Sequence, residues 1–475
     1  MAFPDYFYEK PRKRLLPPKP SSDEAKCHFQ EKWMYPFWAH QRLKIDSLQT
    51  TNGIPVKVLH PGFRNLESGP DFKNAFIAIG TNPPKRCDVE LDIDVSNWQQ
   101  HAHHLNPSFE NVALQVVWNK PKEPGSNEGR LLLHLQEFLD SPLEELLEWE
   151  NSDEAKNIPE NILGKCTPFF QNFTEHESNS LFKQAALIRI KSKSLTIAAT
   201  ARMLGWEKAL LVHLLRGLGY KQNAWPLQKL GELIPSMDIP LENMQALLLG
   251  IAGVIPPKLS NSEKDSYLLH LWSVWWRHQS ECAETIFPEG IWNLSGTRPS
   301  NHPQRRIALA AHWLTELELV QKIEEWVLSD LPPKDAVKKL IKILSPQKKD
   351  DFWEYHYTLN SKKLQKPIPL LGEERVKDLF ANAIAPWCWA RTKGNPTRKT
   401  EKQILERYFQ WPASGSNAHL RLALERFYGN STPMRLKYAY QQQAILQINA
   451  DFCSKTNPCC HHCPLVDCWH ALLKV

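Results

Sequence analysis

Residues 27–139 carry two kinds of hydrophobic spacing, and their order predicts a mixed domain. Residues 31–43 have the spacing of a helix despite Pro36, and residues 54–62 then alternate between apolar and polar side chains as a strand does. Further strand patterns occur at 68–80, 86–95, 111–118 and 130–138, with a short helix pattern at 97–106. The predicted order is helix, three strands, helix and strand, followed by one more strand.

The strand pattern at 86–95 is notable for its charge. Successive side chains of a strand point to opposite faces, so one face carries only apolar residues and the other only acidic ones. The apolar face has Val89, Leu91 and Ile93, and the acidic face has Glu90, Asp92 and Asp94. Such a face is either a binding site or the solvated side of an edge strand.

Beyond residue 179 the apolar positions recur at helical spacing, and Gly and Pro residues separate the segments. A second, mostly helical domain is therefore predicted, and the whole chain is expected to be of the α+β class. The predicted parts are a flexible Pro-rich leader at 1–26, a mixed α/β domain at 27–145, a linker at 146–178, the helical domain at 179–450 and a Cys-rich tail at 451–475.

Composition and charge narrow the class of protein. Of the 475 residues 42% are hydrophobic, yet no stretch approaches the roughly 18 uninterrupted apolar residues of a membrane helix. The first residues lack the apolar centre of a signal peptide, so a cytoplasmic protein without a membrane partner is expected. The net charge of +6 suits a polyanionic partner such as nucleic acid.

Basic residues gather at two places in the predicted helical domain. Arg189, Lys191 and Lys193 form a basic stretch, and a Pro-rich loop at 296–306 carries Arg298 and leads two further arginines into a helix. These side chains are suited to contact a phosphate backbone. The alternatives are a solvated helix face for the first group and a salt bridge between domains for Arg298.

The closing cysteines predict a metal site. Five of the ten cysteines lie within residues 453–468, which read CSKTNPCCHHCPLVDC. Two thiolates three residues apart can hold one ion from a single turn, and flanking cysteines complete the coordination. Zn²⁺ and a [4Fe-4S] cluster both fit this spacing, whereas no secretory signal favours disulfides. The four expected ligands are Cys453, Cys460, Cys463 and Cys468.

The order of elements in the first domain resembles the core of the PD-(D/E)XK nuclease superfamily. There, an Asp opening the second strand and a Glu on the third bind a divalent metal at the scissile phosphate. The resemblance implies that Asp71 and Glu90 bind Mg²⁺ or Mn²⁺, that Asp92 assists, and that Glu31 on the first helix is a further ligand. These oxygen ligands are the kind that both ions prefer.

The lysine of the superfamily pattern is missing, because Asp92 stands where Glu-x-Lys would place it. Two cations are considered as its replacement in stabilising the charge that develops on the phosphate. One is Lys73, two residues after Asp71, and the other is Arg298. The missing lysine equally favours a protein that has lost the enzymatic activity.

Three histidines, His101, His103 and His104, follow Trp98. On a continuous helix His101 and His104 would share a face, where they could contact a phosphate or a second ion. The alternative is a polar helix end that packs against Trp98.

Segments along most of the chain resemble the bacterial DUF2851 family of unknown function. They include residues 48–80 and 88–118, the segment MQALLLGIAGVIP, the segment GTRPSNHPQRRIALAA and the closing cysteines. The resemblance thus runs from about residue 31 to 468. Members of that family usually have histidine where this chain has Asp92 and Gln115.

The resulting hypothesis is a metal-dependent nuclease, or a protein derived from one, that acts on the phosphodiesters of nucleic acid, with DNA favoured over RNA. The alternative is a non-enzymatic nucleic-acid-binding or assembly protein with a degenerate nuclease fold. The sequence has no P-loop, no GxGxxG motif opening a strand–helix unit and no GxSxG motif. NTP hydrolysis, dinucleotide chemistry and serine hydrolysis therefore have no support.

Overall fold

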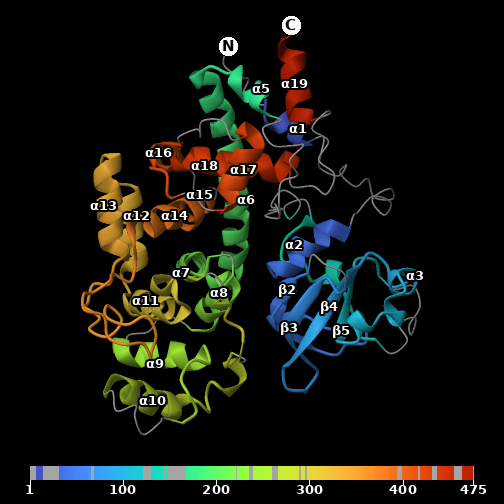
Figure 1. Cartoon of the computed structure of the whole chain (residues 1–475), viewed down its shortest axis with the longest axis vertical. Coiled ribbons are helices and arrows are strands. Elements are labelled where there is room, and N and C mark those ends of the chain that lie inside the picture. Colours follow the sequence, from blue (N-terminus) through green and yellow to red (C-terminus); the bar gives the residue numbers. More distant parts are fainter. Residues whose placement is uncertain are drawn as a thin grey trace. The chain divides into compact units, whose positions relative to one another are not determined.

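The chain divides into two compact units in the computed structural model. A sheet unit comprises residues Leu16–Asn151, and a helical unit comprises Met1–Leu15 together with Ser152–Val475 (Figure 1). The structure describes residues 7–13, 31–65, 69–120, 130–143, 146, 166–220, 222–234, 239–258, 266–287, 290–294, 297–392, 398–415, 418–429, 436–453 and 463–473.

The sheet unit has the predicted order of helix and strands, with the short strand β2 as an addition. Its helices and strands are α2 (Met34–Ala39), β1 (Val56–His60), β2 (Phe63–Arg64), β3 (Phe72–Ile79), β4 (Lys85–Asp92), α3 (Asn97–Gln100), β5 (Val112–Val117) and β6 (Leu132–His134). Its 3₁₀ turns are η2 (Glu31–Trp33), η3 (Ile45–Ser47), η4 (His103–Leu105), η5 (Pro107–Phe109) and η6 (Leu135–Phe138). The first predicted helix is thus shorter than expected, because α2 ends at Ala39.

The strands form one sheet in the order β1-β3-β4-β5-β6, and β2 also pairs with β3 (Figure 1). The pairs β1–β3 and β3–β4 are antiparallel, whereas β4–β5 and β5–β6 are parallel. Strand β4 is therefore central. The solvated edge strand is the wrong interpretation for Glu90 and Asp92, since both are buried, whereas Asp94 lies beyond the strand and is exposed.

Gly62 makes the turn that separates β1 from β2. Its φ of 93° is a conformation that side chains rarely adopt, and a Cβ there would lie 3.1 Å from the carbonyl oxygen of Lys73. A glycine is required for this close approach to β3. The turn places Arg64 in β2, opposite Phe72 at the start of β3.

Helices make up the second unit, as predicted. They are α1 (Glu9–Lys13), α5 (Thr167–Gln171), α6 (Glu175–Leu204), α7 (Trp206–Leu218), α8 (Ala224–Leu233), α9 (Leu241–Ile251), α10 (Ser266–His278), α11 (Pro303–Thr315), α12 (Leu319–Val327), α13 (Pro333–Leu344), α14 (Glu373–Leu379), α15 (Ala385–Thr392), α16 (Arg398–Gln410), α17 (Ala418–Tyr428), α18 (Ala439–Ile448) and α19 (Pro464–Leu473). Among them are the 3₁₀ turns η8 (Ala283–Thr285) and η9 (Pro299–Asn301) and the π-helical turns η10 (Phe380–Ile384) and η11 (Asn449–Cys453).

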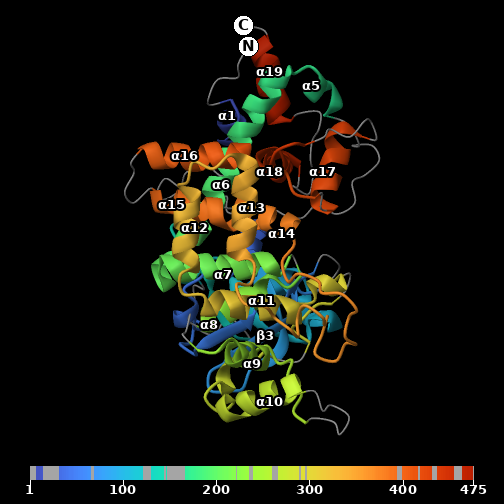
Figure 2. The ribbon, with the colours of Figure 1, turned by 90° about the vertical axis from the view of Figure 1, so that its left-hand side faces the viewer.

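The long helix α6 organises the helical unit. It starts at a capping box in which Thr174 and Glu177 satisfy each other's backbone amides. Helices α15 and α18 pack against it (Figure 1), and α12 and α13 lie side by side (Figure 2). None of the helices in the described part of the chain has the length and apolar character needed to cross a membrane.

Part of the predicted leader belongs to the helical unit. Tyr8 and Arg12, at α1, are buried and both bind Asp451 of η11. The Tyr8 hydroxyl donates a 2.8 Å hydrogen bond to Asp451 Oδ2, and Arg12 Nε lies 3.2 Å from the same carboxylate. Residues 7–13 are therefore held against a segment more than four hundred residues away in sequence.

Candidate functional site

Asp71 and Glu90 meet where β3 begins beside the central strand β4. The backbone amide of Asp71 donates a 3.0 Å hydrogen bond to Glu90 Oε2, and the amide of Leu91 donates a 3.0 Å hydrogen bond to Asp71 Oδ2. Each carboxylate thus lies against the backbone that carries the other. The ladder between the two strands is irregular from Phe72 to Ala75, close to this exchange of hydrogen bonds.

The charges at this site repel one another. Burial raises the pKa of both carboxyl groups, and the charge of Glu31 raises both further. The charge of Asp71 adds to the effect on Glu90, while the Leu91 amide and the Arg64 guanidinium lower the pKa of Asp71. Without a cation, the buried carboxyl groups therefore resist ionisation at neutral pH.

Glu31 reaches this site from the turn before α2. The Tyr35 hydroxyl donates a hydrogen bond to the Glu31 carboxylate, and the charge of Asp71 helps to raise the pKa of Tyr35 after the larger effect of burial. The Arg64 guanidinium stacks on the Tyr35 ring at 3.7 Å from its centroid. Glu31, Tyr35 and Arg64 therefore all lie near Asp71, and of the three only Glu31 was predicted from the sequence.

Lys73, one of the two predicted replacements for the missing lysine, has no described contact with these carboxylates. The Lys73 ammonium lies beside Gly69, 3.4 Å from where a Cβ of that glycine would be. Arg298 is exposed and precedes η9 of the helical unit. Arg64 is a cation that acts on Asp71. In the sequence, its position between Gly62 and the Gly69-Pro70-Asp71 turn could have indicated that it lies near Asp71.

Asp92 ends β4 and is held from the neighbouring strand. Gln115 of β5 donates a 2.8 Å hydrogen bond from Nε2 to Asp92 Oδ2, and its own Oε1 accepts a 3.3 Å hydrogen bond from Arg130 Nε. The Arg130 guanidinium lies 4.7 Å from the centroid of the Trp98 ring. Burial raises the pKa of Asp92 to about 6, although the hydrogen bond from Gln115 opposes the shift.

The histidines are arranged differently from the prediction. Helix α3 ends at Gln100, and Ala102 then adopts a left-handed conformation with φ 55° and ψ 31°. The turn brings together the rings of His101 and His103, whose centroids are 5.4 Å apart. The expected pairing of His101 with His104 on one helix face is therefore wrong, because no helix continues through Ala102.

A model of the DUF2851 family, described as a protein of unknown function, matches residues 31–417. The chain belongs to the DUF2851 family. A search of curated proteins and of solved structures found no significant match. The match begins at Glu31, as the resemblance implied, but it ends before the closing cysteines, which had been included in that resemblance.

In this DUF2851 chain, most of the predicted basic side chains are used for internal contacts. Arg189 and Lys193 of α6 both bind Gln443 of α18, at 2.9 and 3.0 Å. Arg305 and Arg306 are buried and donate to backbone carbonyls at 353–370. These four residues hold the helices together.

The cysteine tail of this DUF2851 chain is described in part. Cys453 and Cys468 are buried and Cys463 is half-buried, and the hydrophobic core of the helical unit includes the first two. The carbonyl oxygen of Cys453 accepts a 2.9 Å hydrogen bond from Arg426. Cys460, the fourth predicted ligand, lies outside the described residues.

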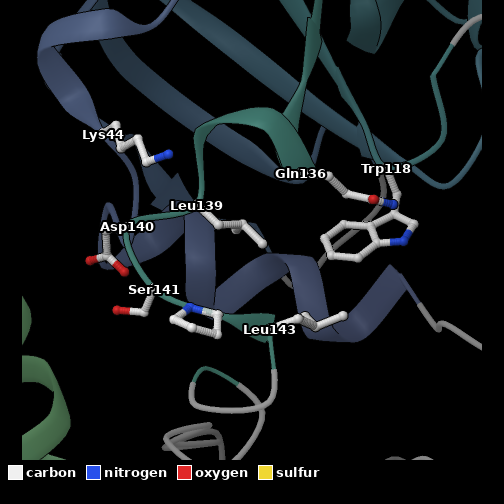
Figure 3. Close-up of a pocket in the computed structure, with 8 residues that line it drawn as sticks. Lys44, Trp118, Gln136, Leu139, Asp140, Ser141 and Leu143 are labelled. Atoms are coloured by element: carbon white, nitrogen blue, oxygen red, sulfur yellow. The ribbon is translucent and has the colours of Figure 1, made fainter. Parts of the chain in front are cut away.

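A pocket of the sheet unit lies apart from the acidic cluster. Figure 3 shows Lys44 and Asp140 on one side of this 460 Å³ hollow and Trp118 on the other. The Asp140 carboxylate accepts hydrogen bonds of 2.8 and 3.1 Å from Arg42, so its charge is already compensated. None of the acidic or histidine side chains at the candidate site lines this pocket.

Proposed function

We propose that this chain is a metal-dependent nuclease, or a protein derived from one, that binds Mg²⁺ or Mn²⁺ through Asp71 and Glu90. The observation that supports it is the exchange of hydrogen bonds between these residues, which holds the half-buried Asp71 and the buried Glu90 together near Glu31. Mg²⁺ is commonly bound by one or two carboxylates, with water and substrate phosphate as its other ligands. Two carboxylates are therefore a sufficient protein contribution.

The side chains fit the chemistry of phosphodiester hydrolysis. When bound, the cation would polarise a phosphoryl oxygen and increase the acidity of a water molecule. Asp71 and Glu90 hold it, and Glu31, oriented by Tyr35, accepts a proton or adds a ligand. Arg64 acts electrostatically on Asp71 and stacks on Tyr35, so it takes the part of the missing lysine in stabilising the phosphate charge.

The topology supports the same proposal. Three antiparallel strands, β1, β3 and β4, are followed by the short helix α3 and by β5 parallel to β4. This is the order that the resemblance to the PD-(D/E)XK superfamily implies. Asp71 comes directly before β3 and Glu90 lies on β4, where that resemblance expects the two metal-binding acids.

Cleavage of labelled single- and double-stranded DNA and RNA tests the proposal. The wild type is expected to cleave DNA with Mg²⁺ or Mn²⁺, and Asp71→Asn and Glu90→Gln are expected to lose the activity. Asp94→Asn is the matched control, because this acid follows the same strand but is exposed. Loss of activity in the control as well would contradict the assignment.

The alternative function has its own outcome in this experiment. Binding of nucleic acid without cleavage by the wild type would identify a binding or assembly protein in which the acidic site is degenerate. The cation is tested separately with Arg64→Ala, Lys73→Ala and Arg298→Ala. Only Arg64→Ala is expected to lower kcat, by roughly 10²–10³-fold, the usual effect of losing one charge-stabilising group.

We also infer that the cysteine tail binds Zn²⁺ or a [4Fe-4S] cluster. The burial of Cys453 and Cys468 supports a structural role, since a buried thiolate needs a cation to be stable. The helical unit would then depend on this metal for part of its stability.

A further inference from the structure

A buried oxygen of Asp92 lacks a partner. Asp92 is only 1% exposed, and its Oδ2 is bound to Gln115. Its Oδ1 is buried and has no hydrogen-bond partner among the described residues. A buried carboxylate oxygen without a donor is costly, and a bound ion is one of the few arrangements that account for it.

His103 presents a second buried atom of this kind. Its ring is stacked on Phe109 with the centroids 4.0 Å apart, and Trp98 contacts it edge-on at 5.4 Å. The aromatic contacts direct Nε2 to within 3.2 Å of Glu90 Oε1, but the two atoms are not aligned for a hydrogen bond. The unused lone pair of a neutral imidazole is available to a metal ion.

Asp92, His101 and His103 converge. One potential ligand atom from each of them lies within 4.8 Å of the other two. Ligands at ~2.1 Å from a tetrahedral ion stand about 3.4 Å apart, so small side-chain rotations would close the site. His101 is exposed, which leaves the site open to water or substrate on one side.

We propose that Asp92, His101 and His103 form a second cation site, which prefers a divalent first-row transition ion such as Zn²⁺ to Mg²⁺. Two imidazoles and one carboxylate are ligands that suit Zn²⁺ and its neighbours, whereas Mg²⁺ prefers oxygen ligands alone. The evidence for this site is the arrangement of Asp92, His101 and His103, and it does not depend on the proposed nuclease activity.

The surroundings of the site support the assignment. Gln115 and Arg130 form a hydrogen-bonded chain behind Asp92, which fixes the orientation of its carboxylate as the outer partners of metal ligands do. Glu90 lies between the two proposed cation sites, with Oε2 toward Asp71 and Oε1 toward His103.

The experiment is a titration of the metal-free, untagged full chain with Co²⁺, followed by visible absorption, with Zn²⁺ and Mg²⁺ as competitors. Cobalt bound by thiolates in the tail is distinguished by its charge-transfer bands in the near ultraviolet. The wild type is expected to bind Co²⁺ at a site without these bands, and Zn²⁺ but not Mg²⁺ is expected to displace it.

Asp92→Asn, His101→Gln and His103→Gln are each expected to weaken this binding by at least 10-fold. His104→Gln is the matched control, because His104 is adjacent in sequence and exposed but outside the group. His101 is exposed, so its variant keeps the fold, which circular dichroism checks for all four. Asp71→Asn is expected to retain the Co²⁺ site even where it abolishes cleavage.

Three results would overturn the proposal. The first is an equal loss of Co²⁺ affinity in His104→Gln and His101→Gln. The second is displacement of Co²⁺ by Mg²⁺ at the same concentration at which Zn²⁺ displaces it. The third is an unchanged Co²⁺ affinity in Asp92→Asn and His103→Gln when both variants are folded. If Co²⁺ binds as expected but the protein cleaves nothing, only the nuclease proposal fails.

Discussion

Gln115 and Asp92 form a buried pair across β4 and β5, joined by a 2.8 Å hydrogen bond. The resemblance to the DUF2851 family implies a histidine at each of these two positions. Because the side chains of Gln115 and Asp92 are hydrogen-bonded, the two differences from the implied histidines form one local change in the structure. Asp92 supplies a carboxylate oxygen at this place, and Gln115 orients it.

Gln115→Leu is expected to weaken Co²⁺ or Zn²⁺ binding by about 10–100-fold, the usual effect of removing the partner of a metal ligand. Leucine has a similar size but donates no hydrogen bond, so Asp92 would lose its fixed orientation. Calorimetric titration measures the affinity. Gln49→Leu, an exposed change in the same unit, should leave it unaltered, and equal affinity in both variants would contradict a role for Gln115.

His60 is expected to make the sheet unit less stable in mild acid. Burial lowers its pKa from 6.5 to about 4, and its Nδ1 accepts a 3.0 Å hydrogen bond from Gly62. Between these two pH values the unfolded chain binds more protons than the folded one. The contribution of His60 to the stability is therefore lost as the pH falls from about 6.5 toward 4, by up to about 3 kcal/mol. The raised pKa values of Asp71, Glu90 and Asp92 shift the stability in the opposite direction, so the His60 contribution is seen only by comparison with a variant.

The measurement is urea unfolding in EDTA at pH 7.5 and 4.5. In His60→Asn, whose Oδ1 can accept the same hydrogen bond, the free energy of unfolding at pH 4.5, relative to that at pH 7.5, should be higher than in the wild type. The exposed His104→Asn should behave as the wild type does. The same change in the free energy of unfolding between the two pH values in all three proteins would exclude a contribution from His60.

Arg305 is expected to be essential to the helical unit. It is fully buried, and its guanidinium donates to the carbonyl oxygens of Trp353, His356, Ile368 and Pro369. Lysine cannot reproduce this planar set of donors, so Arg305→Lys should lower the free energy of unfolding by at least ~3 kcal/mol.

Arg298→Lys is the matched control for this change, because Arg298 belongs to the same Pro-rich segment but is exposed. Its unfolding curve should coincide with that of the wild type. Denaturant unfolding followed by circular dichroism compares the three proteins. A stability of Arg305→Lys within 1 kcal/mol of the wild type would show that the four carbonyls find other partners.

Cys463→Ser is expected to lower both the metal content and the stability of the helical unit, because a structural metal site contributes folding free energy. Anaerobic purification, elemental analysis and an absorption spectrum distinguish Zn²⁺ from an iron–sulfur cluster. Cys282→Ser, a half-buried cysteine outside the tail, is the control. Unchanged metal content and melting in Cys463→Ser would refute the tail site.

The sequence predicted those features of the fold that depend on the local pattern of apolar and polar residues. The alternation of Val89, Glu90, Leu91 and Asp92 predicts a strand with an acidic face, and the structure has that strand. It did not predict that β4 is central, because sheet order depends on pairing between segments that are distant in sequence. The burial of Glu90, and with it the raised pKa, follows from that pairing.

Other features of the site arise from single backbone conformations or long-range packing. Alanine is rarely left-handed, so the turn at Ala102 that joins His101 to His103 leaves no signal in the residue type. Arg64 approaches Asp71 only because β2 folds back on β3. Arg189 looked like part of a basic surface, but its partner Gln443 lies on another helix.

The attachment of Tyr8 and Arg12 to Asp451 bears on how the chain is made. The sheet unit, whose sequence interrupts that of the helical unit, leaves the ribosome complete long before Asp451 is translated. It can fold on its own during synthesis, as domains generally do. The contacts of Tyr8 and Arg12 with Asp451 can form only after Asp451 has been translated, whereas Gln184, which accepts a hydrogen bond from the Tyr8 amide, is available much earlier.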